Sequence, residues 1–393
     1  MILTNKQEQA LKIILNKYKN HEKYVTICGY AGVGKSTLAK FAIEALDVSP
    51  EKVAYATYTG KAAEVLRKKG NSNAMTLHKL LYDSIPRQGG GFIRIPKKTL
   101  DYDIVLIDEI SMAPKSMLEM LLKHKVFCIF MGDNFQLPQI DKNETHDFLQ
   151  HPDIFLNEVM RQAAESEIIR LTMTIRAGEP IKFTEGKEII VIPNSQLVTG
   201  HLKWADQMIC GTNAARVSLN EQMRALLGFE GLPQSGERLI CLRNYWEDID
   251  EMGEACIVNG TTGKIENPYE SFIMAPRYIK MNNHRIDIIK GEFISDDGHI
   301  FSVDMDKKML ETGEFSLDWR ESYALGKIKN KIGDIVPRQF TYGYAITCWK
   351  AQGSEWDKVL AIEERFPYNK LEHQKFLYTA CTRASKKLVL VRE

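Results

Sequence analysis

Residues 29–36 of this chain, Gly-Tyr-Ala-Gly-Val-Gly-Lys-Ser, match the pattern GxxxxGK[ST], whose residue types suit the binding of phosphate groups. An apolar, β-rich run at 24–28 precedes the loop, and a run with helical spacing at 37–46 follows it. In this order of strand, loop and helix, backbone N–H groups can surround phosphate oxygens. We therefore predict that the loop binds a nucleotide, with Lys35 at the β- and γ-phosphates, Ser36 as a ligand of Mg²⁺, and further contacts from Gly32, Val33, Gly34 and Thr37.

Three more polar side chains follow strand-like runs. Asp108 and Glu109 come after the apolar run 104–107, and Gln136 comes shortly after the run 126–131. Carboxylates at the end of a buried strand suit Mg²⁺ coordination beside a phosphate loop, so we predict Asp108 as a metal ligand. Glu109 is then the candidate general base for the attacking water. Gln136 is the candidate sensor of the γ-phosphate, and a plain turn is the alternative explanation of its position.

The overall composition is that of an ordinary globular protein, and it limits the function classes. The 393 residues leave room for two or three domains, and 52 basic against 51 acidic residues give a net charge of +1, so a basic groove has to be local. The seven cysteines are scattered without a CxxC pair, which argues against a structural zinc site or a disulfide framework. Cys28 and Cys128 lie in strand-like runs and are expected core thiols. A polar N-terminal segment and the lack of an apolar run near ~20 residues predict a cytoplasmic protein without a membrane segment.

The texture of the sequence changes along the chain. Strand-like and helix-like segments alternate up to residue 160, which predicts a parallel sheet covered by helices. Residues 82–100 interrupt this alternation and are typical of a β-hairpin with a glycine-rich tip. A second α/β rhythm begins near residue 203, and the glycine-rich stretch 234–338 within it predicts a small all-β module. A lysine cluster at 325–331 is expected to be a solvated face.

The order of these motifs resembles that of superfamily 1 helicases, in the RecD-like and phage Dda-like branch that moves 5′→3′. Besides the phosphate loop, the motifs are Asp-Glu-Ile-Ser at 108–111, Gly-Asp-x-x-Gln-Leu-Pro at 132–138 and the run from glycine to glutamate at 343–355. The resemblance extends over most of the chain. It implies an α/β fold with two RecA-like parallel-sheet motor domains, a β-hairpin pin inserted in the first and an SH3-like β insertion in the second. The implied ranges are 1–81 and 101–160 for the first motor domain, 82–100 for the pin, 161–233 and 339–393 for the second motor domain, and 234–338 for the insertion.

The resemblance also implies roles around the nucleotide, with ATP and Mg²⁺ as the expected cofactors. Gln7 would read adenine, and Gly353 and Glu355 would complete the nucleotide site. Arg161 and Arg383 would be arginine fingers, each able to contribute a rate factor of about 10³–10⁵ at the transferred phosphoryl group. ATP would then close a cleft that hydrolysis opens again.

For nucleic acid, the resemblance implies sequence-independent contacts to a single strand of DNA. The residues concerned are Thr59, Lys61, Thr76, His78, Asn213, Thr347 and Lys350. Helix capping or solvation is the alternative role for such polar side chains. Phe92, near the tip of the hairpin, would stack on a base at a DNA fork or, alternatively, pack into the base of the hairpin.

The implied function is that of an ATP-dependent DNA helicase that moves 5′→3′. The alternative is an ATPase that moves along single strands and displaces proteins without unwinding. A signalling or metabolic NTPase is a third hypothesis, for which the chain lacks an Asn-Lys-x-Asp motif. Polarity and the preference for DNA over RNA come from the resemblance alone. The expected partners are single-stranded and forked DNA, with single-strand-binding, replication or recombination proteins as further candidates, and the expected state is a phage-encoded monomer.

Overall fold

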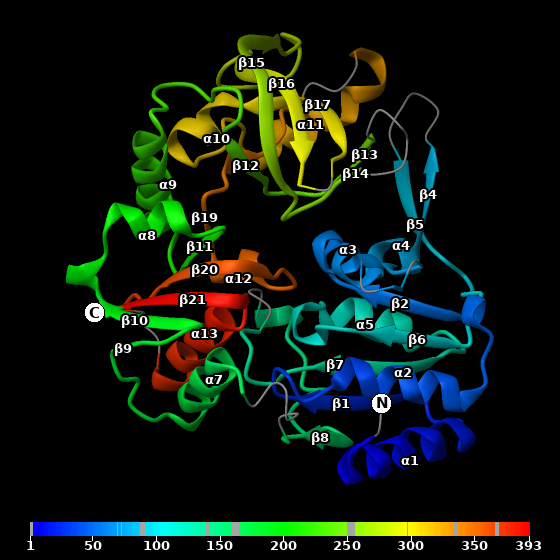
Figure 1. Ribbon diagram of the computed structural model, residues 1–393. Coiled ribbons are helices and arrows are strands. Elements are labelled where there is room, and N and C mark those ends of the chain that lie inside the picture. The colour runs from blue at the N-terminus through cyan, green and yellow to red at the C-terminus, as the bar shows by residue number, and fades with distance from the viewer. Residues whose placement is uncertain are drawn as a thin grey trace. The chain divides into compact units, whose positions relative to one another are not determined.

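The computed structural model describes residues 3–68, 70–71, 73–86, 92–138, 142–158, 165–249, 256–296, 298–332, 336–365 and 369–393. Its contacts divide the chain into two compact units. The first unit comprises Met1–Tyr82, Pro96–Thr212 and Thr347–Glu393, and the second comprises Asp83–Ile95 and Asn213–Ile346. Both units are therefore built from segments that are far apart in the sequence (Figure 1).

The first sheet of the first unit is parallel throughout, with the strand order β3-β2-β6-β7-β1-β8. Its strands are β1 (Tyr24–Gly29), β2 (Val53–Thr57), β3 (Met75–Thr76), β6 (Ile104–Ile107), β7 (Phe127–Gly132) and β8 (Ile154–Leu156). The helices of this part are α1 (Asn5–Lys19), α2 (Lys35–Leu46), α3 (Gly60–Lys68), α4 (Leu77–Leu81) and α5 (Lys115–Leu121).

Alternate residues of these strands enter two different cores, because successive side chains of a strand point to opposite faces. In β6, Val105 and Ile107 join the core formed with α4 and α5, whereas Ile104 and Leu106 join the core formed with α1 and α2. Both faces of the sheet are therefore buried. This explains why its strands are continuously apolar in the sequence, and it confirms the predicted parallel sheet covered by helices.

The second sheet of this unit has the order β19-β11-β20-β21-β10-β9, in which β11, β20, β21 and β10 are parallel neighbours and β9 is antiparallel to β10. The strands are β9 (Thr184–Glu185), β10 (Ile189–Pro193), β11 (Gln207–Cys210), β19 (Ala345–Thr347), β20 (Trp356–Ile362) and β21 (Ala384–Arg392). Four helices accompany it, namely α7 (Glu167–Ala177), α8 (Thr199–Trp204), α12 (Cys348–Ala351) and α13 (Lys370–Cys381). Two parallel sheets of this kind confirm the predicted pair of RecA-like motor folds.

The second unit contains an antiparallel sheet with the order β17-β16-β15-β12-β18. Its strands are β12 (Arg238–Cys241), β15 (Thr262–Met274), β16 (Arg285–Ser295), β17 (Ile300–Asp306) and β18 (Phe340–Tyr342). Two small pairs accompany it, β13 (Tyr245–Ile249) with β14 (Cys256–Ile257) and the hairpin of β4 (Tyr82–Pro86) with β5 (Phe92–Pro96). Helix α9 (Asn213–Leu227) opens the larger segment of this unit.

The expectation of an all-β module at 234–338 is wrong, because this stretch also contains α10 (Lys307–Thr312) and α11 (Trp319–Ile332). The Asp306 carboxylate accepts the backbone N–H of Met309 at 2.8 Å, and Gly313 ends α10 with a φ of 77°. Both are standard helix-boundary signals that the glycine-rich texture of the stretch had obscured. The lysine cluster lies in α11.

Two further predictions concern the core and the membrane. Cys28 and Cys128 are completely buried in β1 and β7, which confirms them as core thiols, and burial raises the pKa of Cys128 to about 12. Among the described residues, no helix is long and apolar enough to cross a membrane.

Candidate nucleotide site

Three neighbouring strands of the first sheet end at the same edge, and each is followed by a segment with candidate functional residues. The order β6-β7-β1 places the turn of Asp108, the turn of Asp133 and the phosphate loop side by side, because the carboxyl ends of parallel strands lie together. The sheet thus brings together segments that are far apart in the sequence.

The phosphate loop has the backbone that its glycines permit. Gly32 and Gly34 have φ values of 74° and 79°, a region that other L-residues rarely adopt. A side chain at Gly29 would collide with the neighbouring strand β8, since its Cβ would lie 2.7 Å from the Leu156 carbonyl oxygen. The Nζ of Lys35 donates to the carbonyl oxygens of Gly29 and Tyr30 at 2.8 and 2.9 Å, at the start of the loop. When a nucleotide binds, its phosphate oxygens would replace these two carbonyl oxygens as acceptors for the Lys35 ammonium group.

Gln7 connects the N-terminal helix to the loop. It is buried at the first turn of α1, where its Oε1 accepts the N–H of Thr4 at 3.0 Å and its own N–H donates to the Thr4 hydroxyl at 3.3 Å, forming a capping box. The same side chain donates through Nε2 to the carbonyl of Val33 at 3.3 Å. These contacts place Gln7 against the loop, and its predicted contact with adenine stays a prediction.

The carboxylate pair and Gln136 meet at the end of β6. The N–H of Glu109 donates to Asp108 Oδ1 at 2.9 Å, and Glu109 has a φ of 52°, an uncommon value for a residue with a side chain. The Nε2 of Gln136 donates to Glu109 Oε1 at 3.5 Å. Among the described residues, Glu109 Oε2 and Gln136 Oε1 are buried oxygen atoms with no protein partner. Such acceptors call for a hydrogen-bond donor, and a water molecule is the donor that the predicted general base requires.

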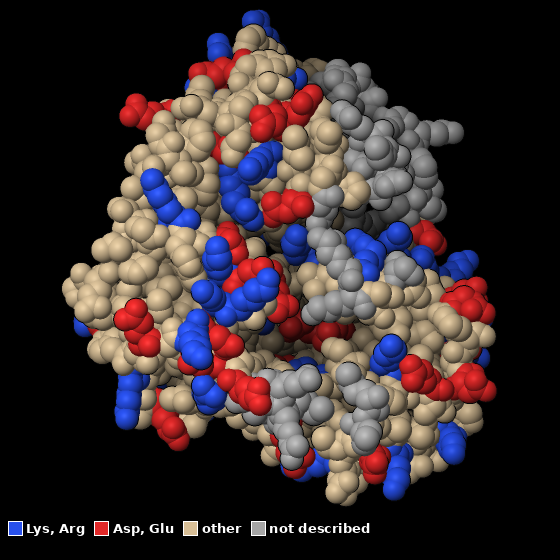
Figure 2. Space-filling view, viewed as in Figure 1, with Lys and Arg blue, Asp and Glu red and all other residues tan. Residues whose placement is uncertain are grey.

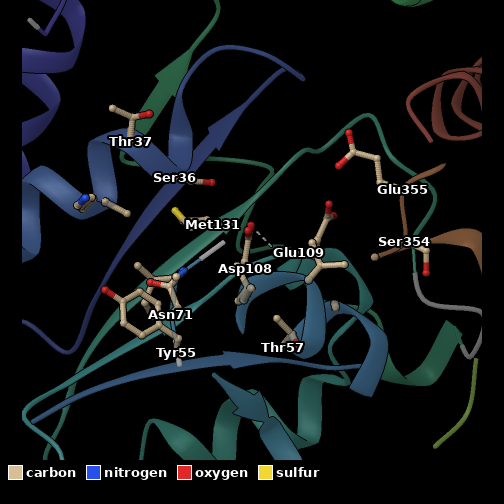
Figure 3. Close-up of a pocket in the computed structure, with 18 of the residues that line it drawn as sticks. Ser36, Thr37, Tyr55, Thr57, Asn71, Asp108, Glu109, Met131, Ser354 and Glu355 are labelled. Atoms are coloured by element: carbon tan, nitrogen blue, oxygen red, sulfur yellow. Dashed lines mark hydrogen bonds between the residues drawn. The ribbon is translucent and has the colours of Figure 1, made fainter. Parts of the chain in front are cut away.

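A cavity of about 670 Å³ lies in front of the carboxylate pair. Its walls include Ser36, Thr37, Asp108 and Glu109 from the first sheet and Glu355 and Arg383 from the second. In Figure 3, Asp108 and Glu109 lie between Ser36 on α2 and the pair Ser354 and Glu355. The hydroxyl of Ser36 and the carboxylate of Asp108 are oxygen ligands of the kind that Mg²⁺ prefers, so the residues present fit this ion.

Arg383 reaches this cavity from the end of α13. Only 6% of the residue is exposed, and its Nε donates to the Thr379 carbonyl at 3.1 Å while Nη1 donates to the Ser354 carbonyl at 3.3 Å. Gly353, another predicted residue, also lines the cavity. Arg161 lies outside the described residues.

The predicted DNA-contact residues of the first unit lie on α3, α4 and α12 or directly before them. Thr59 and Thr76 cap helices: their hydroxyls accept the N–H groups of Ala62 and Lys79, both at 3.2 Å. Thr76 is buried, whereas Lys61, His78, Thr347 and Lys350 are half-buried. Asn213 belongs to the second unit, is exposed, and its Oδ1 accepts Arg216 Nε at 3.3 Å. The side chain of Phe92 lies outside the described part of the structure.

Sequence reasoning missed a group of residues behind the phosphate loop. Asp133 is only 1% exposed and forms an ion pair with Arg176 on α7, with 2.9 Å between Oδ1 and Nη1. Its other oxygen accepts the hydroxyl of Tyr378 on α13. The Gly-Asp pair at 132–133 is the only trace of this group in the sequence, since Arg176 lies 43 positions further on.

Charge alone does not outline a binding surface. On the face shown in Figure 2, Lys and Arg side chains are interspersed with Asp and Glu side chains. This mixture of charges on the face shown agrees with the net charge of +1.

These observations define the class of protein. Ser36 at the end of the phosphate loop, a strand-end carboxylate pair and a buried arginine beside a second sheet line one cavity, as in a P-loop NTPase with two RecA-like folds.

The comparisons with known proteins narrow this class. The family model described as AAA domain matches residues 2–190, and the one described as UvrD-like helicase C-terminal domain matches residues 342–391. The chain is 26% identical over 386 residues to the ATP-dependent RecD2 DNA helicase of Deinococcus radiodurans, covering 96% of this chain and 48% of that protein. It is 30% identical over 191 residues to the ATP-dependent DNA helicase dda of Enterobacteria phage T4, covering 45% of this chain and 43% of that protein. The chain thus spans about half the length of these relatives or somewhat less.

Solved structures share the fold. The crystal structure of Pif1 helicase from Bacteroides in complex with ADP-AlF3 and ssDNA matches with a TM-score of 0.53 and 19% identity, over 99% of this chain and 92% of that one. In sequence the chain is therefore similar to DNA helicases of the RecD and Dda type, and in fold it is similar to Pif1 helicase.

Proposed function

We propose that this protein is an ATP-dependent DNA helicase, a motor that moves 5′→3′ on single-stranded DNA and separates duplex ahead of it. The observation that carries the proposal is the cavity shared by Ser36, Asp108 and Glu109 from one parallel sheet and Arg383 from the other. A change in the nucleotide at this cavity acts on both sheets at once, which is what a motor requires.

The residues have distinct roles in this reaction. Lys35 and the loop N–H groups hold the phosphates, and Ser36 and Asp108 would hold Mg²⁺, which supplies positive charge at the phosphate oxygens. Glu109 accepts a proton from the attacking water, and its partner Gln136, at 3.5 Å, keeps the carboxylate oriented toward it. Arg383 stabilises the charge that the transferred phosphoryl group develops.

DNA as the second substrate is supported by the relatives. The two proteins of similar sequence carry the name ATP-dependent DNA helicase, and the Bacteroides Pif1 helicase was solved with ssDNA. We propose that Thr59, Lys61, His78, Thr347 and Lys350 contact the phosphates of one strand. We further propose that the protein works as a monomer and meets forked DNA.

The test is the rate of ATP hydrolysis with and without a poly-dT oligomer. We expect strong stimulation by the oligomer and near-complete loss of hydrolysis in Lys35→Ala, with single-strand binding retained. Lys12→Ala, an exposed lysine on α1, is the control and should behave as the unmodified protein. Hydrolysis that ignores single strands, or that survives in Lys35→Ala, would contradict the proposal.

Polarity and duplex opening need separate measurements. A duplex with a 5′ tail should be unwound and one with a 3′ tail should not. Deleting residues 89–93, a range that includes the first two residues of β5, should leave DNA-stimulated hydrolysis intact and abolish unwinding. If the unmodified protein hydrolyses ATP on single strands, displaces a bound protein and opens neither duplex, the strand-displacing ATPase is the correct function instead.

A further inference from the structure

One hydroxyl group in the first unit contacts two segments of the nucleotide site at once. Tyr378 on α13 is completely buried, and its hydroxyl donates to the Asp133 carboxylate while it accepts the N–H of Ala31 at 3.1 Å. A phenol hydroxyl has one proton and free lone pairs, so it can make both bonds together. Ala31 belongs to the phosphate loop, and Asp133 begins the turn that contains Gln136.

The surroundings of Tyr378 fix the direction of both bonds. Arg176 pairs with the Asp133 carboxylate at 2.9 Å, and its Nη2 donates to Asn134 Oδ1 at 2.8 Å. The guanidinium also lies over the ring of Tyr30, 4.0 Å from its centre. A carboxylate paired in this way only accepts hydrogen bonds, so the phenol proton points to Asp133 and a lone pair faces Ala31. Burial and the Asp133 charge raise the pKa of Tyr378, which keeps this proton in place at neutral pH.

Thr379, the residue after Tyr378 on α13, forms hydrogen bonds with both Arg383 and the residue that follows Gln136. Arg383 Nε donates to the carbonyl of Thr379, the residue after Tyr378, at 3.1 Å. The Thr379 hydroxyl accepts the N–H of Leu137, the residue after Gln136, at 3.0 Å. The phosphate loop, the residues on either side of Gln136 and Arg383 are therefore all bonded to residues 378 and 379 (Figure 1 shows α13 with β21).

We propose that Tyr378 is a positioning residue for ATP hydrolysis, which aligns Arg383 and Gln136 with the phosphate loop. The inference rests on the proposed function, because it assumes that Arg383 acts on the phosphoryl group. The hydroxyl of Tyr378 bonds to Ala31 and Asp133, which are not themselves predicted catalytic groups. We therefore expect Tyr378 to act through the segments that it holds in place. Loss of the hydroxyl leaves the loop able to bind phosphates but releases it from α13.

The test is Tyr378→Phe, measured as kcat and KM for ATP at saturating poly-dT. We expect kcat to fall about tenfold, since small misplacements of catalytic groups cost up to about 10²-fold, while KM for ATP changes by less than about twofold. Tyr245→Phe is the matched control: its hydroxyl accepts the N–H of Gln339 at 2.7 Å in the second unit, and its removal should leave kcat unchanged.

A double-mutant cycle separates positioning from a merely structural role. Arg383→Lys keeps a positive charge and loses the planar fork, so it should lower kcat, and thermal unfolding checks that the variant remains folded. If Tyr378 acts through Arg383, adding Tyr378→Phe to Arg383→Lys lowers kcat by far less than tenfold. Equal effects of Tyr378→Phe in both backgrounds, or an unchanged kcat in the single variant, would overturn the inference.

Arg176→Lys provides a second variant should Tyr378→Phe fold poorly. It keeps a cation beside Asp133 but loses the second bond to Asn134, so kcat should fall several-fold at constant KM. An unchanged kcat in this variant would contradict the inference. Failure of the proposed function looks different, since the unmodified protein would then show no hydrolysis stimulated by poly-dT.

Discussion

The parallel sheet β3-β2-β6-β7-β1-β8 and the antiparallel sheet β17-β16-β15-β12-β18 bury similar apolar residues, yet only the first gathers the candidate chemistry. In the parallel sheet, the segments after β1, β6 and β7 leave from one edge and meet. In the antiparallel sheet, successive strands end at opposite edges, and charged groups pair locally, as Lys290 does with Asp304 at 3.0 Å. Strand direction alone therefore decides whether polar groups after strands are concentrated or dispersed.

The sharpest test of this difference is Glu109→Gln at the edge of the parallel sheet. The substitution preserves shape and removes the proton acceptor, so kcat for DNA-stimulated hydrolysis should fall by about 10²–10⁴-fold. Glu119→Gln on the exposed side of α5 is the control and should have no effect. Steady-state ATPase assays measure both, and full turnover in Glu109→Gln would remove Glu109 as the general base.

In the antiparallel sheet, the largest effects should concern stability. Phe293 is completely buried, with its ring centre 5.0 Å from that of Phe340, and Phe293→Ala should lower the free energy of unfolding by about 3–5 kcal/mol. Urea unfolding measures this loss, and kcat per folded molecule should stay unchanged. Phe272→Ala, at a side chain that is half exposed, should change stability by less than about 0.5 kcal/mol. If Phe293→Ala lowered kcat as strongly as Glu109→Gln, the proposed division between a catalytic parallel sheet and a structural antiparallel sheet would be wrong.

A smaller effect is expected at Asp153, at the opposite end of the parallel sheet. Its carboxylate accepts the N–H and hydroxyl of Thr26 at 2.8 and 2.9 Å and pairs with Lys17 at 2.8 Å. Burial opposes ionisation, but these bonds outweigh it and lower the pKa of Asp153. Asp153→Asn should therefore cost about 1–2 kcal/mol of unfolding free energy at pH 7.

The loss of unfolding free energy in Asp153→Asn should depend on pH, because the pKa of Asp153 is lowered in the folded protein. A depressed pKa contributes stability above the unfolded value of about 4, and the contribution disappears as the pH falls through the folded value. The difference in unfolding free energy between Asp153→Asn and the unmodified protein should therefore become smaller below about pH 4. A gap that is constant down to pH 2 would show that charge at Asp153 is irrelevant.

The smallest effect separates fold from chemistry at Thr76, on the edge strand β3. Its buried hydroxyl caps α4, so Thr76→Ala should lower the free energy of unfolding by about 1 kcal/mol. Thr76→Ser, which keeps the hydroxyl, should restore most of it. Fluorescence anisotropy with labelled poly-dT should show an affinity within about twofold for both variants, and a large loss in Thr76→Ala alone would assign the hydroxyl to the DNA strand instead.

The parallel sheet was predictable because its strands are buried on both faces. The predicted range 104–107 coincides with β6, since a doubly covered strand is apolar at every position. The phosphate loop and the carboxylate pair were predictable because local sequence determines their geometry. By contrast, the contacts of Tyr378 with Ala31 and Asp133 span 347 and 245 positions and leave no local pattern. Helices α10 and α11 were missed because their capping residues stand within a glycine-rich stretch.

The pairing of β12 with β18 has a consequence for how such a chain can change. Leu239 near the start of the antiparallel segment and Tyr342 near its end are direct partners across these strands. The Cα atoms of partners in an antiparallel pair lie only about 5 Å apart. The roughly one hundred residues between Leu239 and Tyr342 therefore leave and return to the chain at nearly the same point. Such a loop can be lengthened, shortened or exchanged for another without moving its two attachment points. The segment is thus a natural place for evolution, or an engineer, to add a new module while the nucleotide site stays the same.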